Sequence, residues 1–93
     1  MKNEIRYLIY RCLNKWNDKS YIGCTDRSLS YAITKHYKKR DSGDKSSLSL
    51  ALKIYPGCNF AWETIVEGIS KENVREELNF WINHFNSREN GYN

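Results

Sequence analysis

The chain has 93 residues and a formal net charge of +4, from 15 basic and 11 acidic residues. This length allows one domain with a modest core, and 40% hydrophobic and 28% charged residues exclude a mostly disordered chain. No apolar run is long enough to span a bilayer, and the first residues lack the uninterrupted apolar stretch of a signal peptide. We therefore expect an intracellular (cytoplasmic) protein.

The first half of the chain predicts a strand pair and a helix. Residues 5–12 are rich in β-branched and aromatic side chains and predict a strand; residues 14–20 predict a hairpin turn, and residues 21–24 a short second strand. Leu29, Ile33 and Tyr37 recur at four-residue intervals, which predicts an amphipathic helix near residues 28–40. Trp16 lies in the hairpin turn and is the one aromatic residue with no predicted core position.

The second half predicts a helix that Ser46 or Ser47 caps, a strand over residues 60–66 and a helix that starts at Ser70. Phe80, Trp81 and Phe85 are expected in the core, and the polar tail over residues 86–93 is expected to be turn-like. The order β-β-α-α-β-α predicts one α/β domain over residues 1–93, with a three-stranded antiparallel sheet flanked by helices.

Three cysteines lie far apart in the chain and match neither a zinc-site spacing nor a disulfide framework. We expect reduced thiols that pack as small apolar side chains. The three are Cys12, Cys24 and Cys58.

Two motifs on the first strand pair resemble the signature of the GIY-YIG nuclease family in its phage and viral form. Leu8-Ile9-Tyr10 stands where the family has Gly-Ile-Tyr, Tyr21-Ile22-Gly23 matches its second motif, and the two tyrosines are eleven residues apart. His36 follows in the first helix, where the family has a histidine. Residues 50–57, 79–82 and 91–93 resemble later family segments, so the resemblance covers nearly the whole chain.

The resemblance implies metal-assisted hydrolysis of a phosphodiester. One divalent ion, Mg²⁺ or Mn²⁺, would be held by a single glutamate, and an arginine would stabilise the charged phosphate. Tyr10, Tyr21 and His36 would be the catalytic side chains, with the tyrosines positioning or deprotonating the attacking water.

The chain departs from the family at both residues that carry charge. Ala32 stands at the arginine position and Leu78 at the glutamate position, where it completes an apolar stripe with Val74, Ile82 and Phe85. Glu77 is adjacent, but one residue along a helix is about 100° away. We therefore expect no cofactor for the sequence as it stands, and we name no confident metal ligand.

Our first interpretation is a nuclease-fold protein whose cleavage chemistry is lost or weakened and whose cleft binds DNA, RNA or a nucleotide. Asn93 occupies the family's terminal asparagine position, although a frayed terminus is an alternative. The side chains expected to bind are Lys35, Lys38, Lys39, Arg40, Lys45 and Asn93.

Two other interpretations stay open. The chain could be an active metal-dependent DNA endonuclease, captured with alanine in place of arginine at position 32 and with Glu77 as a displaced metal ligand. It could also be an interaction protein that captures a host protein or a signalling nucleotide, or that assembles with a second copy of itself. None of these interpretations involves a membrane.

Overall fold

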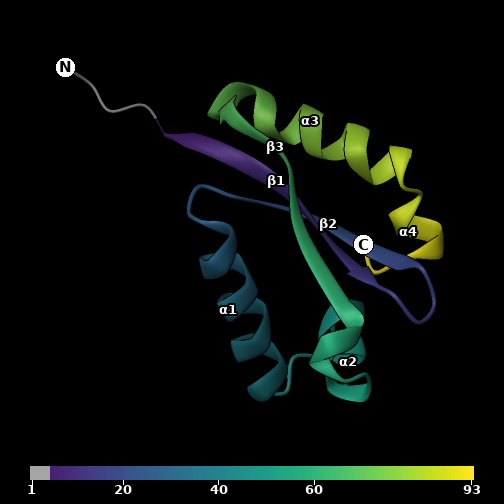
Figure 1. The fold of residues 1–93 in the computed structure, drawn as a ribbon. Helices are drawn as coiled ribbons and strands as arrows, with labels where there is room; N and C mark the ends of the chain where they lie inside the picture. The colour runs from purple at the N-terminus through teal and green to yellow at the C-terminus, as the bar shows by residue number, and fades with distance from the viewer. Residues whose placement is uncertain (1–4) are drawn as a thin grey trace.

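The computed structural model describes residues 5–93 and has a three-stranded antiparallel sheet with helices on both faces (Figure 1). The strands, in the spatial order β2-β1-β3, are β1 (Arg6–Asn14), β2 (Lys19–Thr25) and β3 (Phe60–Ser70). The helices are α1 (Leu29–Asp41), α2 (Ser47–Ile54), α3 (Lys71–His84) and the short α4 (Ser87–Asn90). This confirms the predicted α/β class and the order β-β-α-α-β-α.

Side chains alternate across the sheet and build a separate core on each face. Cys12 and Phe60 point toward the face that α1 and α2 cover, where they pack with Leu48, Ala51 and Leu52 of α2. Ile9 and Ile22 point to the opposite face, where they pack against α3. Figure 1 shows α1 and α2 on one side of the sheet and α3 on the other.

Serine caps set the beginnings of the first two helices. The Ser28 side chain accepts a hydrogen bond from the Tyr31 backbone N–H at 3.1 Å, and Ser46 accepts one from Ser49 at 3.4 Å. Each cap satisfies one of the backbone donors that a helix start leaves without a partner. The helix starts expected near residue 28 and at Ser46 or Ser47 are thereby confirmed.

The third strand extends four residues beyond the predicted end at residue 66. Between the pairs Ile9–Val66 and Tyr7–Ile69, β3 has one residue more than β1, and Gly68 has a φ of 77°. A glycine with positive φ accommodates such a β-bulge without steric cost, so the strand continues through it.

The C-terminal tail forms a helical turn and then runs back along the edge strand β2. The Tyr92 backbone N–H donates to the Ser20 carbonyl at 2.8 Å, and the Tyr92 hydroxyl accepts hydrogen bonds from Asn14 and Asn17 in the hairpin. The expectation of a turn-like tail was therefore wrong over α4, because contacts with β2 stabilise a helix too short to form alone.

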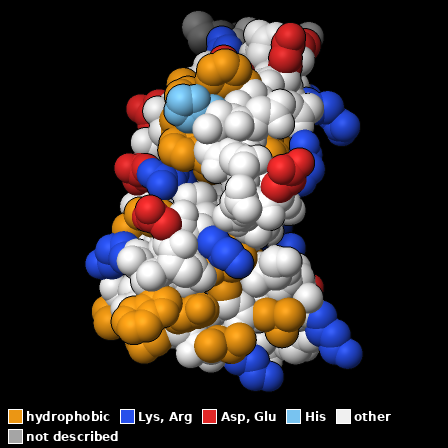
Figure 2. Space-filling model, turned by 90° about the vertical axis from the view of Figure 1, so that its right-hand side faces the viewer, with side chains coloured by type: hydrophobic (Ala, Val, Ile, Leu, Met, Phe, Trp, Pro, Cys, Tyr) orange, Lys and Arg blue, Asp and Glu red, His pale blue; other side chains and the backbone are white. Residues whose placement is uncertain are grey.

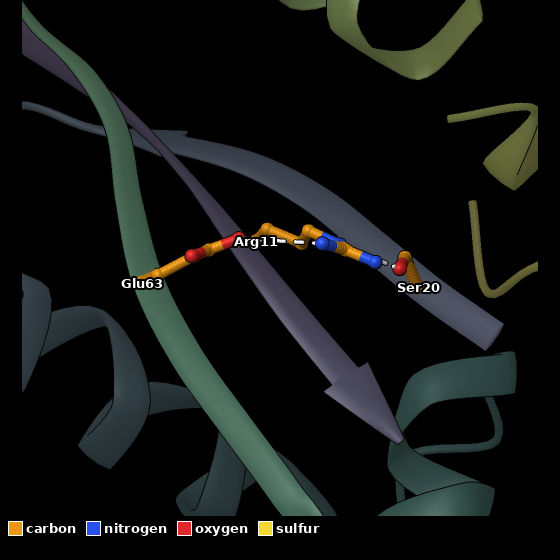
Figure 3. A network of polar contacts seen from close by, with 3 residues as sticks. All are labelled: Arg11, Ser20 and Glu63. Atoms are coloured by element: carbon orange, nitrogen blue, oxygen red, sulfur yellow. Dashed lines mark hydrogen bonds and ion pairs between the residues drawn. The ribbon is translucent and has the colours of Figure 1, made fainter. Parts of the chain in front are cut away.

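A polar network on the α3 side of the sheet ties the central strand to both of its neighbours (Figure 3). Arg11 Nε donates to Ser20 Oγ of β2 at 2.9 Å, and its Nη1 lies 3.3 Å from Glu63 Oε1 of β3. The guanidinium also stacks on Phe85, with 4.4 Å between Cζ and the ring centroid. The side chain of Arg11 is thus engaged on the α3 side of the sheet.

Phe80 was expected in the core but is 58% exposed. It lies one residue before Trp81 and therefore outside the stripe of α3 that packs on the sheet. The cysteines are all free, but Cys58 is exposed and does not pack as a core residue. Within residues 5–93, no helix is long and apolar enough to cross a membrane.

Candidate functional site

Four ring side chains meet on the α1 side of the sheet. Tyr10 of β1 and Tyr21 of β2 have ring centroids 6.2 Å apart, and His36 of α1 lies 5.1 Å from Tyr21. The Tyr10 hydroxyl is 2.6 Å from His36 Nε2. Trp62 of β3 stacks on the His36 ring, with 5.7 Å between the ring centroids. The structure thus brings together the three residues expected to be catalytic.

Gly23 is the residue that lets the two tyrosines approach each other. A Cβ at this position would lie 2.5 Å from the Tyr10 hydroxyl oxygen and 2.8 Å from Tyr21 Cε2. Such contacts are too short for any side chain, so only glycine fits beneath the tyrosine pair. The glycine of the second motif therefore has a packing role in the site.

Burial decides the protonation of this cluster. It raises the pKa of Tyr10, with a further contribution from the neighbouring Tyr21, and it also raises the pKa of Tyr21. Burial, together with Lys39 and Lys35, lowers the pKa of His36 to about 4. At neutral pH we therefore assign a neutral imidazole whose Nε2 accepts a hydrogen bond from the Tyr10 hydroxyl.

A pocket of about 380 Å³ opens beside the ring cluster, between α1 and the end of β2. Ala32, Tyr10, Tyr21 and His36 contribute to its wall. Three cations and one carboxylate also line it, which makes a net charge of +2 with His36 neutral. These charged side chains are Arg27, Lys35, Lys39 and Asp26.

The other expected binding residues lie outside this pocket. Lys38 lines a separate hollow on the outer side of α1. Arg40 pairs with Asp41 at 2.8 Å and stacks on Tyr37, and Lys45 is exposed beyond the end of α1. Trp16 is 76% exposed at the hairpin tip and does not line the pocket.

Asn93 is bound to the chain itself. Its Oδ1 accepts hydrogen bonds from the Ile22 backbone N–H and from Ser87 Oγ, both at 2.7 Å, and its Nδ2 donates to the Ile22 carbonyl at 2.8 Å. The alternative interpretation of Asn93 as part of a frayed terminus is therefore wrong. The amide closes the free edge of β2 and has no contact with the pocket.

Both departures from the family pattern have a clear structural setting. Ala32 is buried on the wall of the pocket. Leu78 packs in the α3-side core with Val74, Trp81 and Ile82, and Glu77 is half-buried and does not line the pocket.

The position at which the family pattern places its metal ligand offers no donor atom for a divalent ion. Asp26 is the one carboxylate among the described residues that line the pocket, and residues 5–93 contain no group of three His, Cys, Asp or Glu side chains that could hold a metal ion. Leu78 offers no oxygen. No step through a metal ion can be derived from this arrangement.

Two residues of the site were not recognised from the sequence. Trp62 was assigned only to a strand, although its alternation with Phe60 placed both on one face. Arg27 lies before the first predicted helix, and nothing in the local sequence indicates that its side chain reaches the pocket.

Solved structures share this fold over nearly its whole length. The catalytic domain of the homing endonuclease I-TevI superposes with a TM-score of 0.80 and 32% identity, covering 94% of this chain and 96% of that one. A point mutant of the same catalytic domain gives a TM-score of 0.82 and 30% identity, covering 95% and 92%. The chain belongs to the GIY-YIG nuclease family.

A curated relative agrees with this assignment. Intron-associated endonuclease 1 of enterobacteria phage T4 is 33% identical over 87 residues, which cover 91% of this chain. The chain matches 35% of the length of that relative. No protein-family model matches the chain.

Proposed function

We propose that this GIY-YIG domain binds nucleic acid, or a nucleotide, in the pocket between α1 and the sheet, with its cleavage chemistry lost or weakened. The observation that carries the proposal is the pairing of a basic pocket with an intact tyrosine and histidine cluster. The relatives are named endonucleases, and phosphate is the polyanion that a net positive pocket of this kind would attract.

Weakened cleavage is supported by the groups at the positions that should carry charge. Ala32 offers no cation on α1, and Leu78 offers no metal ligand on α3. The loss of one such electrostatic contribution typically costs about a hundredfold or more in rate. Tyr10 is also unsuited as a general base, because a raised pKa keeps its hydroxyl protonated.

Mg²⁺ or Mn²⁺ belongs to the second candidate function, a metal-dependent endonuclease. Retention of Tyr10, Tyr21 and His36 in contact with one another favours keeping this candidate. Without a carboxylate at position 78, a metal would need another ligand, and the site residues provide no obvious set.

Binding is tested by fluorescence anisotropy with labelled single-stranded and duplex DNA at 50 and 200 mM salt. If Arg27, Lys35 and Lys39 each contact a phosphate, affinity should fall about 20-fold for single strands and about 40-fold for duplex over this range. The aromatic wall should make the protein tolerant of sequence.

Two results would contradict the proposal. One is the absence of binding at 50 mM salt to DNA, to RNA of the same sequence and to nucleoside monophosphates. The other is an affinity that does not change with salt, because contacts between basic side chains and phosphates release counterions.

A further inference from the structure

Arg27 lies in the connection between β2 and α1, and its side chain lines the pocket. Within residues 5–93, its guanidinium makes neither a hydrogen bond nor an ion pair, and its backbone N–H donates to Thr25 Oγ1 at 3.1 Å. Arg11 and Arg40, in contrast, each have a carboxylate partner. The five N–H donors of Arg27 are therefore available to a ligand.

The ring of Tyr31 supports this guanidinium. Arg27 Cζ lies 5.2 Å from the Tyr31 ring centroid, and Tyr31 is the chain neighbour of Ala32. All three residues line the same pocket. Stacking holds a guanidinium by its flat face and leaves the N–H donors at its edge free, and this planar fork matches two oxygens of a phosphate.

Two lysines complete a cationic rim around the pocket. Lys35 and Lys39 lie four residues apart on α1, so they project from the same face of the helix. Asp26 is the one carboxylate among the lining residues, so the rim stays positive overall. Ala32 is small, and the absence of a long side chain at that position leaves room for a ligand beneath Arg27.

We propose that Arg27 is the phosphate-binding residue of this pocket and acts from the β2–α1 connection in place of the cation missing at position 32. This inference rests on the proposed function, because it requires a phosphate-bearing ligand. The ligand class is a nucleic acid strand, one of whose phosphates lies between Arg27 and the two lysines, with Tyr10, Tyr21 and His36 as the wall behind it.

The test compares dissociation constants for a labelled single-stranded DNA of 20 nucleotides, measured by anisotropy at 50 mM salt. Arg27→Ala should weaken binding about 10- to 100-fold, because charged hydrogen bonds are lost. Arg27→Lys should remain several-fold weaker than wild type, since lysine keeps the charge without the fork. Arg75→Ala removes the same charge from an exposed site on α3, across the sheet, and should stay within about twofold.

Thermal unfolding of each variant separates loss of binding from loss of fold; if Arg27→Ala does not fold, the comparison of Arg27→Lys with wild type decides. Suppose that the wild type binds and that the dissociation constant of Arg27→Ala lies within twofold of the wild-type value, or that Arg27→Ala and Arg75→Ala weaken binding equally. Either result overturns the role of Arg27 and leaves the proposed function standing. No binding by the wild type to DNA, RNA or nucleotide overturns both.

Discussion

At the scale of single residues, the pair of Tyr10 and His36 defines the chemical state of the site. The hydroxyl and Nε2 are 2.6 Å apart inside a cluster that excludes most water, so each group favours its neutral form. This pair can position a ligand or a water molecule, but neither member carries a charge at neutral pH. The charges that face the pocket come from residues around it.

His36 should make the stability of the domain depend on pH. Its folded-state pKa of about 4 lies below the ordinary value of 6.5, so the unfolded chain binds more protons between these two values. The contribution is fully present above pH 6.5 and is lost as the pH falls toward 4. We expect the free energy of unfolding of the wild type to fall by on the order of 1 kcal/mol more than that of His36→Gln over this pH range, after allowance for solvent screening.

Urea denaturation at pH 7.0 and 4.5 measures this difference. Glutamine retains hydrogen-bonding capacity at position 36 but does not titrate. The free energy of unfolding of His36→Gln should therefore change with pH only through the other titratable groups of the chain. His84→Gln is the matched control, because His84 is exposed on α3, and it should behave as wild type does. An identical loss of stability in wild type and His36→Gln would contradict the assignment.

At the scale of elements, the tail is a structural part of the sheet. Asn93 forms hydrogen bonds with both backbone groups of Ile22, and the Tyr92 N–H donates to Ser20. These contacts cover backbone groups of β2 that an edge strand would otherwise expose. Gly91 is required here, because a Cβ would collide with the carbonyl oxygens of Ser20 and Ser87.

Asn93→Ala should therefore destabilise the domain by about 1–2 kcal/mol, since it leaves the Ile22 groups and Ser87 Oγ without this partner. Urea denaturation measures the change. Asn90→Ala, at an exposed position of α4, is the control and should lie within about 0.5 kcal/mol of wild type. If both variants were equally stable, the amide would not be holding the edge of β2.

The helices were predicted more accurately than the strand ends. The starts of α1, expected near residue 28, and of α2, expected at Ser46 or Ser47, could be predicted because a cap acts on backbone groups two or three residues away. The end of β3 depends on a bulge opposite β1, which is a contact between segments far apart in the chain. Local patterns carry no information on such pairing.

At the scale of the whole molecule, the two positions that the nuclease chemistry of the family would combine come from different helices. Ala32 faces the pocket from α1, whereas Leu78 packs in the core beneath α3. Cys24 connects the two regions, because it lines the pocket and also packs against the core that contains Leu78. An arginine at position 32 and a glutamate at position 78 would therefore need one change in each of two helices.

Another face of the molecule has a different character. Figure 2 shows apolar side chains gathered at its lower end, where Figure 1 places α2. Leu50 and Ile54 are 44% and 73% exposed there, next to Tyr55 and Tyr92. None of these four residues lines the basic pocket, so this apolar surface is distinct from the pocket.

The double variant Ala32→Arg with Leu78→Glu tests whether cleavage was weakened by these two residues. We expect background nicking of supercoiled plasmid by wild type with Mg²⁺ or Mn²⁺, and at least about a tenfold gain for the double variant. Each single variant should stay near background, because the two charged groups would act on the same reaction. Adding Tyr21→Phe should remove the gain.

Two outcomes would contradict this expectation. Wild-type nicking at the rate of the double variant would show that the chain cleaves without the two family residues. A folded double variant that binds DNA but never nicks would leave binding alone as the function. Circular dichroism must accompany the assay, because Leu78→Glu places a carboxylate in an apolar core.

The sequence alone determined the order of the elements from β1 to α3 and the spacing of the tyrosine pair and His36, and its resemblance to the family marked Ala32 and Leu78 as departures. These depend on periodicity, spacing and residue type, which are local properties of the chain. Only the tertiary structure decided that Trp62 stacks on His36, that Arg27 lines the pocket and that Asn93 closes the edge of β2. Such contacts join segments that meet only after the strands pair and the helices pack on the sheet.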